Sequence, residues 1–199
     1  AANLVDLTKK STFNFDVLTL NPIFEIATST NNVFQPTDAN LGLTGTNIPN
    51  AADKRLTFYT ATGTAPAVRI GGFGLTSTTS YPIYLPGEIT LIKAEALARQ
   101  ATPDLTNALV ELNKVITKAP SADPFGVGAG LTAIAGPLTQ AQLLDEVYKQ
   151  RCVELYMSGL KIEDMRRFNR PTSERKRNFF PYPFTERDNN TNTPADPAF

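Results

Sequence analysis

Histidine and tryptophan are absent from this 199-residue sequence, and cysteine occurs once. Without histidine the chain lacks the commonest general base and the commonest metal ligand, so the usual serine and cysteine catalytic triads are excluded. The single cysteine, Cys152, rules out an internal disulfide framework and a thiolate metal cluster. Its four-residue spacing from Tyr148 and Tyr156 predicts a small, buried apolar side chain instead. We therefore expect no metal site, no cofactor and no catalytic residue.

Neither sign of charge is in excess, because 19 Lys and Arg residues balance 19 Asp and Glu residues. Binding to nucleic acid or to an anionic membrane surface depends on an excess of positive charge. We therefore expect no nucleic-acid partner, and small neutral or mixed ligands fit better. Basic residues do cluster between Arg166 and Arg177. Aromatic residues are sparse there, so the cluster predicts a solvated surface with pairs to nearby carboxylates rather than a phosphate site.

Long hydrophobic runs are also missing. No apolar stretch approaches the roughly 20 residues that a membrane-spanning helix needs. Ala1 to Leu20 lacks the basic start and apolar middle of an export signal, although a mature exported protein would lack that signal too. The hydrophobic fraction of 41% is nonetheless enough for a core of ordinary size, in one domain or a large part of one.

The first part of the chain, residues 1–83, is rich in Thr, Asn, Gly and Pro. Short apolar runs, such as Pro22 to Ile26 and Leu56 to Tyr59, stand between turn-forming residues. We interpret these runs as short strands in a loop-rich region.

The remainder, residues 84–199, has helical periodicity. Pro86 suits the first position of a helix that continues to about Gln100, and a second helix should follow Pro103 and end before Pro120. The short link between them favours an antiparallel pair. Thr139 and Gln142 have the spacing of a capping box, which marks a third helix start. The Pro-rich tail from Phe179 should be extended.

The stretch from Val147 to Phe168 carries charges on the otherwise apolar side of a helix, breaks at Ser158-Gly159, and restarts as a short turn rich in Asp and Arg. A lone buried ion costs several kcal/mol, so these charges should pair with one another. Four residues are expected in this network: Arg151, Glu154, Asp164 and Arg166.

Four stretches, taken in order, resemble the SusD/RagB family, nutrient-binding outer-membrane lipoproteins of Bacteroidetes. Val147 to Phe168 resembles the family's ER-x-x-EL-x-x-EG-x-R-x-x-DL-R-R-W-like signature. Tyr81 to Ala96 resembles its R-x-x-E-x-x-L-x-x-AEA helix, and Ala108 to Ala119, with Asn113, resembles the partner helix. Phe180 to Glu186 is similar to its P-I-P-x-x-E element.

The chain departs from the family pattern at four positions, Leu85, Gln150, Ser158 and Leu160, and each change removes a charge. The remaining structural network would comprise Glu88, Glu95, Arg151, Glu154, Asp164, Arg166 and Arg167.

The resemblance implies a mainly α fold of the SusD type, with tetratricopeptide-like helix pairs beside a loop-rich region with short strands. Family members are far longer, so both regions would belong to one larger domain whose N-terminal part, with its lipid anchor, is absent from this chain. The implied localisation is the cell outer membrane, as a surface- or periplasm-facing lipoprotein. The implied function is non-catalytic capture of oligo- or polysaccharide and its delivery to a SusC-like TonB-dependent transporter.

The family's ligand face would be supplied by the loops before the Glu88 helix. Six residues there are candidates for ligand contact, with anchoring in the core or in a loop as the alternative for each aromatic: Phe34, Asp38, Tyr59, Arg69, Phe73 and Tyr81.

Other functions remain open. Glu88 and Glu95 lie two helical turns apart, roughly 10 Å along the axis, which could suit an inverting glycosidase, although carboxylates beside many arginines are more often salt-bridged. The ligand could instead be a peptide or another nutrient. Alternatively, the helices could form a structural transporter lid or a protein-interaction module.

Overall fold

Helices carry most of the regular structure in the computed structural model, which describes residues 5–28, 34–64, 66–175 and 181–195. The predicted mainly α fold is therefore confirmed. The chain divides into two compact units, Ala1–Tyr156 and Met157–Phe199.

Three helices form the core of the first unit: α3 (Pro86–Ala98), α4 (Leu105–Thr117) and α5 (Gln140–Glu154). Each begins at the signal that the sequence provides. Pro86 occupies the first turn of α3. The side chain of Asp104 caps α4 by accepting a hydrogen bond from the backbone N–H of Asn107 at 3.1 Å. Thr139 and Gln142 form the capping box of α5. The three predicted helices are therefore confirmed.

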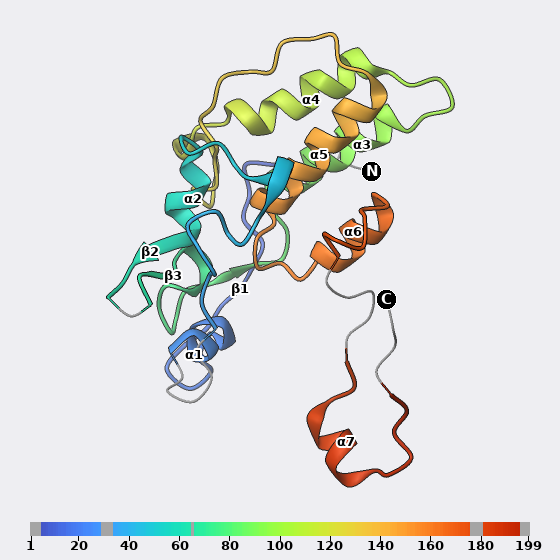
Figure 1. Ribbon diagram of the computed structural model, residues 1–199. Helices are drawn as coiled ribbons and strands as arrows, with labels where there is room; N and C mark the ends of the chain where they lie inside the picture. The colour runs from blue at the N-terminus through green and yellow to red at the C-terminus, as the bar shows by residue number, and fades with distance from the viewer. Residues whose placement is uncertain (1–4, 29–33, 65, 176–180, 196–199) are drawn as a thin grey trace. The chain divides into compact units, whose positions relative to one another are not determined.

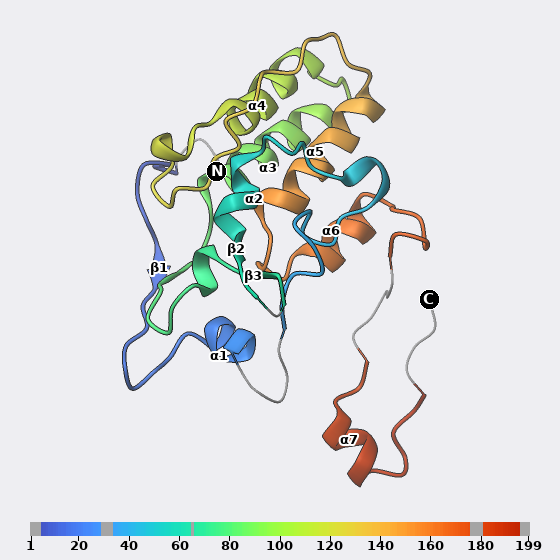
Figure 2. The same ribbon diagram turned by 60° about the vertical axis from the view of Figure 1, so that its left-hand side comes forward.

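The three helices pack against one another. Helices α3 and α4, joined by the short link 99–104, lie side by side as an antiparallel pair, and α5 contacts both (Figures 1 and 2). Fully buried apolar side chains fill the space between them: Leu91, Ala94, Ala108, Leu112, Leu143 and Val147. The buried face of α3 is narrower than its apolar stripe suggests, because Ile92 is 43% exposed. Cys152, near the end of α5, is buried as expected.

Two predicted strands are wrong, because these runs form helices α1 (Pro22–Thr28) and α2 (Lys54–Tyr59). Each helix is started by a residue that also suits turns. The Asn21 side chain accepts a hydrogen bond from Ile23 N at 2.9 Å, and Pro22 is preset for the first helical position. The Asp53 side chain accepts from Arg55 N at 3.0 Å. These caps allow the short apolar runs to form short helices.

Short strands occur elsewhere in the loop-rich region. β1 (Thr12–Phe13) pairs antiparallel with β4 (Tyr81–Pro82), and β2 (Thr60–Thr62) pairs antiparallel with β3 (Val68–Ile70). The described residues also form single turns of 3-10 helix: η2 (Gly45–Asn47), η3 (Gly72–Gly74) and η4 (Pro120–Ala122).

The second unit contains α6 (Lys161–Arg167) and α7 (Phe184–Asn189). Helix α5 ends at Glu154, before the expected break, with Leu155 as its C-cap. Met157 and Gly159 follow it and adopt positive φ angles of 70° and 82°. Helix α7 corrects the expectation of an extended tail from Phe179. It begins after Pro183, where a run without proline leaves the backbone amides free for helical bonds. Residues 176–180 lie outside the described ranges.

Basic side chains of the second unit pair with nearby carboxylates. Arg166 binds Glu163 at 2.7 Å, and Arg170 binds Glu174 at 2.8 Å. Among the residues described, no helix is long and apolar enough to cross a membrane.

Candidate functional site

Arg55, on α2, is completely buried and is surrounded by polar partners. Its Nε and Nη2 donate to the two oxygens of Asp53 at 3.0 and 2.7 Å, and Nη1 donates to Glu154 Oε2 at 2.9 Å. Burial by itself lowers the pKa of Arg55, but hydrogen bonds to Asp53 and the charges of Glu154 and Asp53 outweigh it and raise the pKa. The guanidinium therefore stays charged in the core.

Glu154 extends these contacts to a second cation. Its Oε1 accepts from Lys118 Nζ at 2.9 Å, and the same ammonium donates to Asp123 Oδ2 at 2.6 Å. Asp123 in turn accepts hydrogen bonds from two backbone amides of the following loop. We call the following set the buried charge network: Asp53, Arg55, Lys118, Asp123, Gln150 and Glu154. It ties α2, the loop after α4 and the end of α5 together.

A pocket of about 440 Å³ opens beside this network, and we call it the polar pocket. Two members of the network, Asp53 and Gln150, line it. The other lining residues come from residues 49–52, the loop 130–134, α4 and α5: Pro49, Asn50, Ala52, Ile116, Gly130, Leu131, Thr132, Ile134, Glu146, Lys149 and Val153. The volume lies within the range of small-molecule sites, roughly 300–1,000 Å³.

Helix α5 contributes one face to the polar pocket. Glu146, Lys149, Gln150 and Val153 recur at helical spacing, so they project from the same side of the helix. Gln150 connects this face to the core: its Oε1 accepts from Arg55 Nη2 at 2.5 Å, and its Nε2 donates to Glu146 Oε1 at 2.7 Å. The Lys149 ammonium forms no ion pair with any residue that the structure describes.

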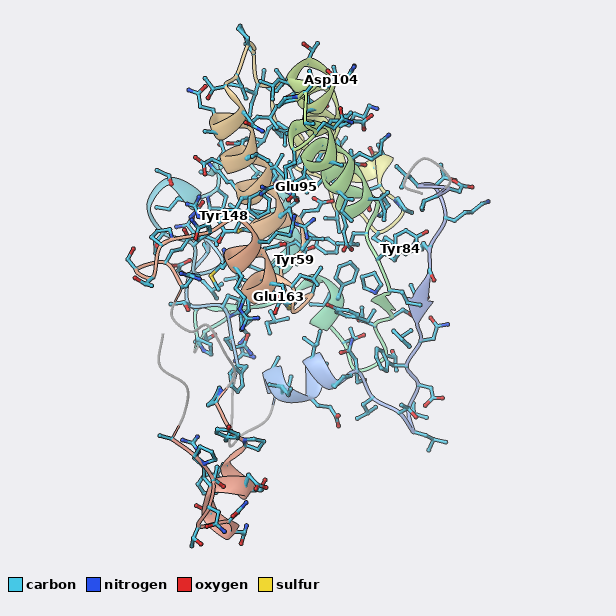
Figure 3. All side chains as sticks on the ribbon, turned by 90° about the vertical axis from the view of Figure 1, so that its right-hand side faces the viewer. Tyr59, Tyr84, Glu95, Asp104, Tyr148 and Glu163 are labelled. Carbon is cyan, nitrogen blue, oxygen red and sulfur yellow. The ribbon has the colours of Figure 1, made fainter. Side chains whose placement is uncertain are left out.

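Two of the predicted ligand residues, Tyr59 and Phe73, lie in the core. Tyr59 is fully buried, and its hydroxyl donates to the backbone oxygen of Glu154 at 2.6 Å (Figure 3). Phe73 is 5% exposed and contacts the Tyr59 ring edge-on, with a centroid distance of 6.2 Å. Together with four neighbouring rings they form an aromatic cluster: Phe58, Tyr81, Phe125 and Tyr156. These contacts favour an anchoring role for both side chains.

The other predicted ligand residues lie nearer the surface. Phe34 is 67% exposed, Arg69 is exposed, and Tyr81 is half-buried in β4. Asp38 stabilises its own loop, because its Oδ1 accepts from the backbone amides of Asn40 and Gly42. None of the six predicted residues lines the polar pocket.

Several of the predicted structural charges have a partner on the same helix or next to it. Glu95 is buried and binds Arg99 at 2.8 Å, Glu88 is half-buried in the first turn of α3, and Arg151 is buried in α5. In the second unit Arg167 binds Asp164 at 2.6 Å. Figure 3 shows Glu95 within the helical core and Asp104 at the end of the helices remote from Tyr59.

The sequence patterns did not indicate Arg55 and Lys118 as partners of Glu154, or Asp53 and Gln150 as further partners of Arg55. One signal was available: Asp53 and Arg55 stand two apart at the end of a stretch, Ser11 to Ala52, in which charge is sparse. An Asp followed two residues later by an Arg, next to a stretch with few charges, indicates a helix-capping carboxylate that pairs with the arginine.

The described part of the chain contains no group of three or more acidic or thiol side chains placed to hold a metal ion. No protein-family model matches the sequence, and no curated protein matches it either.

Proposed function

We propose that this chain is the C-terminal portion of a SusD/RagB-like lipoprotein of the cell outer membrane. In this role it binds oligo- or polysaccharide without catalysis and passes it to a SusC-like TonB-dependent transporter. The four sequence stretches in family order support the proposal. So do the helices α3, α4 and α5, which include parts of three of these stretches.

The polar pocket is the main structural support for the proposed ligand binding. Sugars need hydrogen-bonding groups for their hydroxyls and apolar surface for the C–H face of the ring. The pocket offers both. Asn50, Thr132 and Gln150 supply amides and a hydroxyl, while Ile116 and Leu131 supply aliphatic surface. A site of this kind binds with modest affinity because water competes for the same groups.

The glycosidase alternative receives little support from the proposed carboxylate pair. Glu95 Oε1 accepts from Arg99 Nε at 2.8 Å. We therefore assign Glu88 and Glu95 to the structure of α3 rather than to chemistry.

A second candidate function is protein interaction, and one surface feature favours it. Val17 and Leu18 are 82% and 91% exposed. They stand on a turn that Asp16 holds in place, because its Oδ1 accepts from Leu18 N and Thr19 N at 2.8 Å each. A fixed turn with two exposed apolar side chains suits docking to a protein partner, such as a transporter.

Native affinity electrophoresis tests glycan binding directly. The chain is run through gels that contain plant, host or microbial polysaccharides, with a parallel calorimetric titration of short peptides. We expect retardation by at least one polysaccharide, and its loss in the double variant Thr132→Ala/Lys149→Ala, which removes two polar groups from the pocket. Lys9→Ala, at an exposed lysine outside the pocket, is the matched control.

Two other outcomes would change the proposed site or contradict the proposed ligand. Retardation that survives the pocket variant but disappears in Phe34→Ala would move the ligand to the loop face. Heat release with peptides and no retardation by any polysaccharide would contradict glycan capture.

A further inference from the structure

The charges around the polar pocket are unequally available to a ligand. Asp53 lines the pocket, yet both of its oxygens are occupied by Arg55: Oδ1 accepts from Nε and from the backbone N–H, and Oδ2 accepts from Nη2. This bidentate pairing offsets part of the carboxylate's charge, but the same guanidinium also pairs with Glu154. Asp53, Asp123 and Glu154 share two cations, Arg55 and Lys118, so the buried charge network keeps a negative charge beside the pocket.

Glu146 and Lys149 remain as the two charged groups of the pocket wall. They stand three residues apart on α5, but the described structure contains no ion pair between them, so their charges are not cancelled by contact. Glu146 and the buried charge network repel an anionic ligand, which Lys149 alone attracts, and Lys149 repels a cationic one. An uncharged ligand with hydroxyls avoids both penalties and can hydrogen-bond to either group.

Arg55 fixes the polarity of this wall through Gln150. A guanidinium has only donors, so the oxygen of the Gln150 amide must face Arg55 and its NH₂ must point the other way. That NH₂ donates to Glu146 Oε1. Glu146 is therefore held as an acceptor at the pocket.

We propose that the polar pocket takes the uncharged, hydroxyl-rich end of a neutral oligosaccharide, and that Glu146 excludes sugars that carry a carboxylate. The inference rests on the proposed function, because it names the ligand class for the same pocket. Gln150 and Arg55 act as positioning residues for Glu146.

Isothermal titration calorimetry with matched trisaccharides tests the inference. Each neutral trisaccharide is compared with its uronate counterpart of the same linkage, at low salt and in 1 M NaCl. We expect the neutral sugar to bind roughly five- to tenfold more tightly at low salt, the size of one like-charge contact a few ångströms apart in a water-filled site. High salt should narrow that ratio because it screens the charge of Glu146.

The variant Glu146→Gln should bring the two affinities within about twofold, because it keeps the shape and removes the charge. Glu25→Gln, at an exposed carboxylate on α1, is the matched control and should keep the wild-type ratio. Circular dichroism melts of each variant establish that it is folded.

The outcomes separate this inference from the function on which it rests. Sugar binding in which the uronate binds as tightly as the neutral sugar, or in which Glu146→Gln leaves the ratio unchanged, overturns the inference and leaves glycan capture standing. Absence of binding by every sugar to the folded wild-type chain overturns both.

Discussion

Glu154 connects two buried cations and a tyrosine hydroxyl. Its two carboxylate oxygens bind Arg55 and Lys118, and its backbone oxygen accepts from Tyr59. A buried ion pair adds little net stability compared with apolar packing, but the loss of one partner leaves an uncompensated charge. The stability of the first unit should therefore depend strongly on each member of the pair.

Replacement of Arg55 by methionine tests this dependence. Arg55→Met leaves Asp53 and Glu154 buried without their guanidinium, so we expect the free energy of unfolding to fall by about 3–5 kcal/mol. Urea denaturation followed by circular dichroism measures the change. Lys9→Met, at an exposed position, should stay within about 0.5 kcal/mol of wild type. Equal midpoints for both variants would show that the buried charges are dispensable.

Tyr59 should make stability depend on alkaline pH. Burial raises its pKa well above the ordinary value, and the charge of Glu154 raises it further. The unfolded chain then releases the phenol proton near pH 10 while the folded chain keeps it. The contribution of Tyr59 to the free energy of unfolding is therefore complete below about pH 10 and is lost as the pH rises further. Burial acts in the same direction on the pKa values of Tyr81 and Tyr156.

Tyr59→Phe should make the decline in unfolding free energy above pH 10 less steep. At pH 7 it should cost about 1 kcal/mol for the lost hydrogen bond to Glu154 O. Denaturant titrations from pH 7 to 11 measure both effects. Phe58→Leu disturbs the same aromatic cluster without removing an ionisable group. It should therefore lower the free energy of unfolding at every pH and leave its slope against pH unchanged. If the free energy of unfolding of Tyr59→Phe declined above pH 10 as steeply as that of wild type, Tyr59 would not be the cause of the decline.

Helix α2 depends on other elements for its existence. Its six residues are far below the length at which an isolated helix is stable in water. The cap by Asp53 and the contacts of Arg55 and Tyr59 with α5 hold it in place. The same contacts hold Asp53 at the polar pocket, so α2 and the pocket should be lost together when α5 unfolds.

Gly87 sets how closely the start of α3 approaches α5. A Cβ atom at this position would lie 1.8 Å from Glu154 Oε1, which is buried and held by Lys118. Gly87→Ala should therefore destabilise the fold by about 1–3 kcal/mol or more, despite the better helix propensity of alanine. Thermal melts compare it with Ala96→Ser at an exposed position of the same helix, expected to change little. A stabilised Gly87→Ala variant would argue against this close contact.

At the scale of the whole molecule, the helices that the sequence predicts are those with strong local signals. Pro86 and the Thr139–Gln142 pair act within one helical turn, and a long apolar periodicity follows each. Helices α1 and α2 have seven and six residues, too few for a period to be visible, and their caps, Asn21 and Asp53, are residues that also suit turns.

The candidate site could be predicted only in part, because its partners are distant in sequence. Glu154 was expected in a charge network from its place on an apolar helix face. Its partner Arg55 lies 99 residues away, and no local pattern connects the two. The polar pocket draws its walls from four separate segments, and the burial of Tyr59 and Phe73 depends on contacts between such segments. Only the folded arrangement reveals these features.

The lone thiol of Cys152 lies two residues before Glu154, in the last turn of α5. A buried thiol is inert to alkylating reagents until the surrounding structure opens. Because the sequence contains no second cysteine, every modification event reports the same place. The rate of alkylation therefore measures how often the end of α5 detaches from its neighbours, and its acceleration in Arg55→Met would give the kinetic contribution of the buried charges to that opening.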